Sequence, residues 1–243
     1  MALVLPHSIF FHVGRTAGHC VRKTIREMGI PTYDVGAFHD CPSNIPLTDE
    51  ERRKLFFCFV RHPLAWLKSF WCHQTQFGWG TDIYSRAVRS DSFAEFLEKA
   101  VAAYPDGPAT EIFRPFVTQC RDVGRQENLE ADLRRILERA GERIVPEVLD
   151  RREVTTVSVD RRIAESATAP RELLEKALRS EREICERFGY GDIPRGMIGP
   201  RQACLTPYVE LGTSKHPFTA EDAALGDVRN AFALNDGRFA GAA

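Results

Sequence analysis

The sequence predicts a single α/β domain of three layers, in which a central, mainly parallel sheet is flanked by helices. The chain has 243 residues, of which 43% are hydrophobic and 28% charged, and this composition suits one domain with a full core. Two apolar runs, SIFFHV from Ser8 and KLFFCFV from Lys54, are typical of buried strands, and the second is expected to be buried on both faces. Each run leads through a short connection into an amphipathic helix, which is the order of elements in a parallel α/β sheet.

The first unit, residues 8–29, is predicted to be a strand, a glycine-bearing loop and a helix. The strand includes residues 9–13 and the loop runs from Gly14 to Gly18. The helix has Val21, Ile25 and Met28 on its apolar side and ends at Gly29. Because the first amide groups of a helix have no intrahelical acceptor, they point into the loop.

Capping signals and apolar periodicity predict the later elements. We expect a short strand at 33–35, a short helix after Thr48, a strand at 54–60 and a helix beginning at Pro63. Three longer helices are expected, after Ser92, from Glu127 to Gly141 and from 170 to 188, with a strand or extended segment at 153–159. Residues 1–190 would form the α/β domain, and residues 191–243 a loop-rich extension with at most one helix.

Charge and cysteine content exclude several classes of partner. A net charge of −1 argues against a nucleic-acid partner or an anionic membrane surface. The seven cysteines are scattered and form no C-x-x-C pair, which indicates reduced thiols in a cytoplasmic protein. We expect neither a signal peptide nor a transmembrane segment. Oligomeric state is not predicted.

The loop GRTAG, residues 14–18, has the composition of a phosphate site. Gly14 and Gly18 allow close approach of the backbone and positive φ angles, Arg15 supplies a charge and Thr16 a hydroxyl. A nucleoside-triphosphatase loop has four residues between its glycines, then Lys and a metal-binding Ser or Thr, whereas here the next residues are His19 and Cys20. The sequence therefore predicts a phosphate site without a metal, and the alternative is an ordinary glycine turn.

A second strand-to-helix corner carries Arg61 and Ser69. Ser69 lies about two helical turns beyond Arg61, and the ends of parallel strands meet at one edge of a sheet, so both side chains can face one ligand there. An arginine and a hydroxyl at this edge are suited to a second phosphate. The alternative for Arg61 is a surface ion pair, and for Ser69 a plain helix hydroxyl.

Together the two corners resemble the sulfotransferases that use 3′-phosphoadenosine 5′-phosphosulfate (PAPS), in particular the carbohydrate sulfotransferases and their bacterial relatives. The family's first motif, like H-I-P-K-T-G-G-T-S, corresponds to HVGRTAGHC at 12–20. Its second motif, V-R-x-P followed by Ser, corresponds to VRHP at 60–63 with Ser69. The segment from Glu127 and Asn128 resembles the family's E-N-L-x-x-D helix, and FGY at 188–190 its closing motif. The resemblance spans roughly residues 8–190.

The resemblance implies a P-loop-like fold, PAPS as sulfuryl donor, 3′,5′-ADP as product, no metal, and a hydroxyl or amine acceptor such as a carbohydrate or small metabolite. It assigns residues 14–20 to the 5′-phosphosulfate, and Arg61 and Ser69 to the 3′-phosphate. The residues assigned to the 5′ side are Gly14, Arg15, Thr16, Ala17, Gly18, His19 and Cys20. The family's Lys is here Arg15, its Thr-Ser pair is His19-Cys20, and an Arg often found after the Pro is Trp66.

Catalysis would require Arg15 at the leaving group and a base for the acceptor. We predict His39 as this base, because relatives often carry a His between the first helix and the second motif and because imidazole accepts protons near neutral pH. The alternative for His39 is a loop residue that caps a neighbour. Two other function classes remain open for the chain: a metal-dependent nucleotide kinase or NTPase, and a nucleotide-binding module without catalysis.

Overall fold

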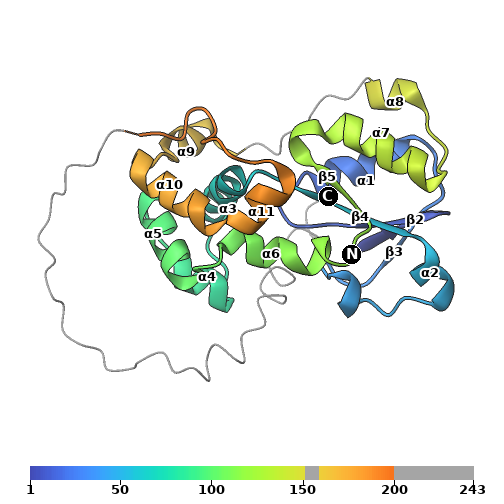
Figure 1. The fold of residues 1–243 in the computed structure, drawn as a ribbon, viewed down its shortest axis with the longest axis horizontal. Coiled ribbons are helices and arrows are strands. Elements are labelled where there is room, and N and C mark those ends of the chain that lie inside the picture. Colours follow the sequence, from blue (N-terminus) through green and yellow to red (C-terminus); the bar gives the residue numbers. More distant parts are fainter. Residues whose placement is uncertain (151–158, 200–243) are drawn as a thin grey trace, which may run out of the picture.

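The computed structural model describes residues 1–150 and 159–199, and within them a five-stranded sheet carries the candidate site (Figure 1). The sheet has the order β3-β1-β2-β4-β5. Its strands are β1 (Ala2–Val4), β2 (Ser8–Phe11), β3 (Tyr33–Val35), β4 (Leu55–Val60) and β5 (Asp122–Arg125).

The sheet is mixed, so the expectation of a mainly parallel sheet is wrong. β2, β4 and β5 are parallel, but β1 runs antiparallel to both β2 and β3. The connection from Val4 to Ser8 is closed by a hydrogen bond from the Leu5 amide to the Ser8 carbonyl, and a link of this length is too short for a parallel crossover. β1 was not predicted, because its three residues stop just before Pro6.

Helices cover both faces of the sheet because its central strands alternate their side chains between two cores. Phe10, Phe57 and Phe59 pack with α1 and α7, whereas Phe11 and Cys58 pack with the helical group that includes α3, α5, α6, α10 and α11. Figure 1 shows α1, α7 and α8 together on one side and the helical group at the other end of the molecule. The helices are α1 (Gly18–Glu27), α2 (Asp49–Arg53), α3 (Pro63–Phe77), α4 (Ile83–Val88), α5 (Phe93–Ala103), α6 (Pro108–Val117), α7 (Leu129–Ala140), α8 (Pro146–Asp150), α9 (Arg161–Ser166), α10 (Arg171–Ser180) and α11 (Arg182–Phe188).

Most of the predicted elements are present at the predicted places. α2 begins at a complete capping box between Thr48 and Glu51, and α7 ends at Gly141 with a positive φ of 76°. The Ser92 side chain caps α5 by accepting from the Glu95 amide. The Glu95 carboxylate accepts from the Asp91 amide and not from the Ser92 amide, so the capping box of α5 is incomplete.

The helix predicted from 170 to 188 is two helices, α10 and α11, which meet at Glu181. The Glu181 carboxylate accepts hydrogen bonds from the first turn of α6, a helix that the sequence analysis did not predict. The predicted segment at 153–159 lies almost entirely outside the described residues. The boundary at 190 stays a prediction, and residues 191–199 add Met197 to the core.

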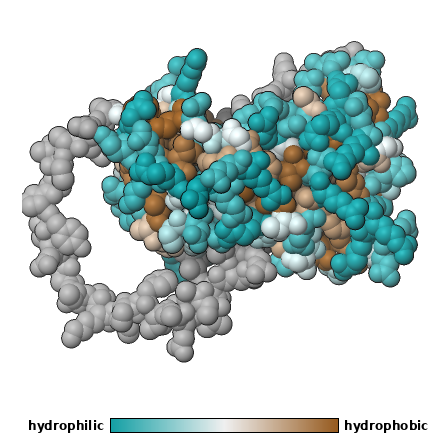
Figure 2. Space-filling view, in the orientation of Figure 1, coloured by the Kyte–Doolittle hydropathy of each residue, from teal (hydrophilic) through white to brown (hydrophobic). Residues whose placement is uncertain are grey.

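The surface in Figure 2 is mainly hydrophilic, with hydrophobic residues exposed in small separate areas. Across residues 1–150 and 159–199, no helix combines the length and the apolar composition needed to cross a membrane.

Candidate functional site

The site is built where β2 and β4 end side by side. These strands pair in parallel with Phe11 opposite Cys58, so the loop at 14–18 and the corner at Arg61 leave the same edge of the sheet. Arg61 Nη1 lies 3.4 Å from the Arg15 carbonyl oxygen, to which it donates. Arg15 in turn donates to Ser69 Oγ from Nε at 3.3 Å and from Nη2 at 3.2 Å. The two strand-to-helix corners therefore lie side by side, and Arg15 contacts both Arg61 and Ser69.

The loop obtains its curvature from residues other than its glycines. Arg15 and Ala17 have positive φ angles of 64° and 63°, whereas Gly14 and Gly18 are not among the positive-φ residues, so that part of the expectation is wrong. Gly18 is needed for space instead, because a Cβ there would lie 1.7 Å from Cδ2 of His12. The His12 ring thus packs directly against the start of α1.

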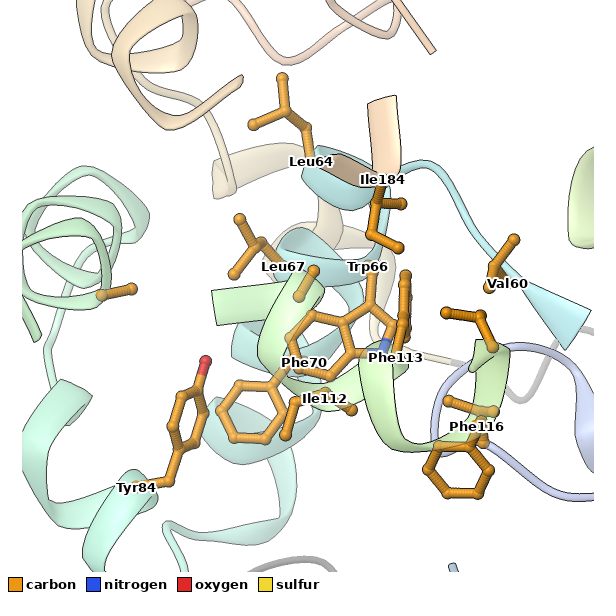
Figure 3. Close-up of a cluster of buried hydrophobic side chains, with 14 of the residues drawn as sticks. Val60, Leu64, Trp66, Leu67, Phe70, Tyr84, Ile112, Phe113, Phe116 and Ile184 are labelled. Carbon is orange, nitrogen blue, oxygen red and sulfur yellow. The ribbon is translucent and has the colours of Figure 1, made fainter. Parts of the chain in front are cut away.

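Two side chains hold the loop from inside. Thr16 is fully buried and its hydroxyl donates to the Val13 carbonyl at 2.8 Å, so this hydroxyl closes the loop on itself. Trp66, also fully buried, donates from Nε1 to the Gly14 carbonyl at 2.9 Å. Figure 3 shows its indole packed between Phe70 and Phe113, with ring centroids 5.5 and 5.8 Å away. Trp66 therefore supports the loop from α3, a role that the sequence analysis did not foresee.

The first turn of α1 begins at the end of the loop. The amides of Cys20 and Val21 donate to the Ala17 carbonyl, whereas those of Gly18 and His19 precede the first intrahelical bond. The first turn contains no acidic side chain that would compete for these amides. The positive end of the helix dipole and the loop amides consequently favour an anion.

Arg61 and Lys68 bring positive charge that no described carboxylate neutralises by an ion pair. Arg61 is partly buried, and burial lowers its pKa, an effect that the nearby Glu127 opposes. Burial likewise lowers the pKa of Lys68, which precedes Ser69 on α3. Desolvated cations without counter-ions are costly, so this edge of the sheet is suited to a ligand with more than one negative charge.

Three histidines gather beside the loop. The His12 ring centroid lies 5.1 Å from that of His19 and 4.8 Å from that of His39. His39 Nδ1 lies 3.1 Å from the His12 carbonyl, so the loop that carries His39 reaches the end of β2. Burial, followed by the charges of His39 and His19, holds the pKa of His12 well below its usual value. Across the described parts of the chain, no three His, Cys, Asp or Glu side chains form a group that could hold a metal ion.

The end of β5 completes this edge of the sheet. Glu127, in the 3₁₀ turn Gln126–Asn128, accepts from the His62 amide at 2.7 Å and from the Tyr190 hydroxyl at 2.9 Å. These contacts join the segments that resemble the E-N-L-x-x-D and F-G-Y motifs to the corner at Arg61. Tyr190 was not among the predicted site residues, because nothing local in the sequence indicates this long-range bond.

Comparison of the chain with known protein families, curated proteins and solved structures found no match.

Proposed function

We propose that this chain is a PAPS-dependent sulfotransferase with a P-loop-like α/β fold. The observation that carries the proposal is the meeting of Arg15, Arg61 and Ser69 at the ends of two adjacent parallel strands, with Arg61 ion-paired to no described carboxylate. Two arginines next to the N-terminus of a helix are suited to a ligand with two separate phosphate groups. The donor PAPS and its product 3′,5′-ADP are such ligands.

Each end of the nucleotide has its own set of groups in this proposal. Arg61 and Ser69 bind the 3′-phosphate, and Arg15 with the amides of residues 14–20 binds the 5′-phosphosulfate. Ser69 Oγ already accepts from Arg15, which leaves its hydroxyl proton for a phosphate oxygen. Because the Thr16 hydroxyl is used inside the loop, Thr16 contributes through its amide group.

The transfer step follows from these positions. The acceptor hydroxyl attacks sulfur, the bond from sulfur to the bridging phosphate oxygen breaks, and Arg15 stabilises the charge on the leaving 5′-phosphate. His39 takes the acceptor's proton. A carbonyl only accepts hydrogen bonds, so the contact to the His12 carbonyl puts a proton on Nδ1 of His39 and makes Nε2 the basic nitrogen.

One observation favours a second candidate, a nucleotide-binding module without catalysis. The 5′ side of the site has fewer hydroxyls than the resemblance implies, because Thr16 bonds to Val13 and the family's Thr-Ser pair is His19-Cys20. The third class, a metal-dependent kinase or NTPase, would need a hard ligand where Cys20 stands.

A thermal-shift panel followed by a turnover assay tests the proposal. 3′,5′-ADP should raise the melting temperature more than AMP, or ATP with Mg²⁺, because a ligand that binds only the folded state stabilises it by mass action. PAPS should then be consumed when carbohydrates or small hydroxyl-bearing metabolites are added as acceptors. Stabilisation without turnover would favour the binding module, and a response to ATP with Mg²⁺ alone would contradict the sulfotransferase proposal.

A further inference from the structure

The Glu127 carboxylate joins the ends of β4 and β5 to the segment that follows α11. One carboxylate oxygen accepts from the His62 backbone amide at 2.7 Å, and the other accepts from the Tyr190 hydroxyl at 2.9 Å. Tyr190 is buried, and burial and the Glu127 charge raise its pKa, so it keeps the proton that it donates. Both oxygens of one side chain are thus used to join three parts of the chain.

Two further contacts hold the same segment, residues 188–192, against the strand ends. His62 Nε2 lies 2.8 Å from the Asp192 carbonyl, and Arg125 Nη1 lies 3.4 Å from the Phe188 carbonyl. The rings of His62 and Tyr190 have centroids 5.1 Å apart. His62 is consequently fixed through its amide, its ring nitrogen and its ring face.

This arrangement acts on Arg61 through its backbone neighbour. Arg61 is the residue between the end of β4 and His62, and its guanidinium has one hydrogen bond to the described residues, the long 3.4 Å contact to the Arg15 carbonyl. Because no ion pair with a described residue holds its guanidinium, the position of that group depends on the backbone at 61 and 62. Burial lowers the pKa of Arg61, and the Glu127 charge is close enough to oppose this shift. The two side chains nevertheless form no ion pair.

We propose that Glu127, supported by Tyr190, is a positioning residue that sets the preference of this site for 3′-phosphorylated nucleotides. This inference rests on the proposed function, in which Arg61 binds the 3′-phosphate. Loss of the carboxylate would release the His62 amide and misplace Arg61, which lowers affinity for 3′,5′-ADP and leaves AMP affinity almost unchanged. If Glu127 had only a general structural role, its loss would lower the affinities for 3′,5′-ADP and AMP equally.

Calorimetry with 3′,5′-ADP and AMP on four variants tests the inference. Glu127→Ala should lower 3′,5′-ADP affinity by about tenfold or more and AMP affinity by less than about twofold. Tyr190→Phe should give a smaller loss of the same kind. Glu127→Gln should restore most of the preference, because its amide oxygen still accepts from His62 and its amide nitrogen donates to Tyr190. Glu130→Ala is the matched control, since Glu130 is an exposed carboxylate three residues along.

Amide exchange of the unliganded protein gives a second readout that needs no nucleotide. The His62 amide should exchange about tenfold faster or more in Glu127→Ala than in Glu130→Ala, because its acceptor is gone. If the wild type binds neither nucleotide, the proposed function fails, and exchange at His62 still decides whether Glu127 positions the strand end. If the wild type prefers 3′,5′-ADP and Glu127→Ala keeps that preference, the positioning role alone is overturned.

Discussion

Trp66 on α3 donates a 2.9 Å hydrogen bond from its indole Nε1 to the Gly14 carbonyl at the start of the loop at 14–18. Trp66 and Gly14 are both buried, so neither group can replace this hydrogen bond with one to bulk water. Trp66→Phe should therefore lower the free energy of unfolding by about 1–3 kcal/mol beyond the cost of lost volume, and should weaken 3′,5′-ADP binding.

Trp71→Phe is the matched control for that variant. Trp71 is a buried tryptophan on the same helix, and its Nε1 has no hydrogen-bond partner among the described residues. Denaturant unfolding of both variants separates the hydrogen bond from the ring volume. Equal destabilisation by the two substitutions would show that the bond to Gly14 contributes nothing.

His39→Ala should lower kcat by about 10² to 10⁴ with little change in 3′,5′-ADP affinity, because a general base acts only in the transition state. His39 has a φ of 64°, which alanine adopts poorly, so His39→Asn should be made in parallel. Asparagine tolerates this backbone conformation and lacks a basic nitrogen. Turnover near the wild-type rate in either variant would exclude His39 as the base.

Transfer should need no divalent metal. Cys20 stands where a metal-binding hydroxyl would be, and the loop at 14–18 has no carboxylate. PAPS turnover in EDTA should equal turnover in Mg²⁺. Activity that is lost in EDTA and returns with Mg²⁺ would support the kinase or NTPase class instead.

Sequence reasoning predicted the parts of the site that lie close together along the chain. The apolar runs of β2 and β4 and the loop at 14–18 were visible because burial on both faces and strand-to-helix corners leave local patterns. β5 was not visible, because its four residues include two charged side chains and a glycine. That glycine is explained only by packing, since a Cβ at Gly124 would lie 2.3 Å from the Phe59 ring.

The contacts that sequence reasoning missed are long-range. Trp66 stands where the resemblance to sulfotransferases often implies an Arg, and only the fold shows that its indole reaches Gly14 from a separate helix. The bond between Glu127 and Tyr190 joins residues 63 positions apart. Neither contact leaves a periodicity or a spacing in the sequence. The first depends on how α3 packs against the loop after β2, and the second on how the segment after α11 packs against the end of β5.

Glu181 should make the free energy of unfolding depend on pH. It is fully buried and accepts from the amides of Ala109 and Thr110 and from the Thr110 hydroxyl at 2.7–2.8 Å. Burial raises its pKa from 4.5 to about 7, although these bonds oppose the shift. The pKa of Glu181 is higher in the folded protein than in the unfolded one. The stability that Glu181 contributes is therefore complete below pH 4.5 and is lost as pH rises through about 7.

The free energy of unfolding should therefore fall by roughly 3 kcal/mol across that window because of this group. Glu181→Gln, which cannot ionise, should lack this fall. Urea unfolding of both proteins between pH 4 and 8 measures the difference, and parallel curves would rule out a raised pKa for Glu181.

The assignment of Arg61 to a 3′-phosphate is the central claim, and calorimetry of Arg61→Ala with 3′,5′-ADP and with AMP tests it most directly. The wild type should bind 3′,5′-ADP in the micromolar range. The variant should lose about 10-fold to 150-fold in 3′,5′-ADP affinity, the equivalent of one charge-assisted hydrogen bond of ~1.5–3 kcal/mol, with almost no loss for AMP. Equal losses for the two nucleotides, or no measurable 3′,5′-ADP binding by the wild type, would contradict the account.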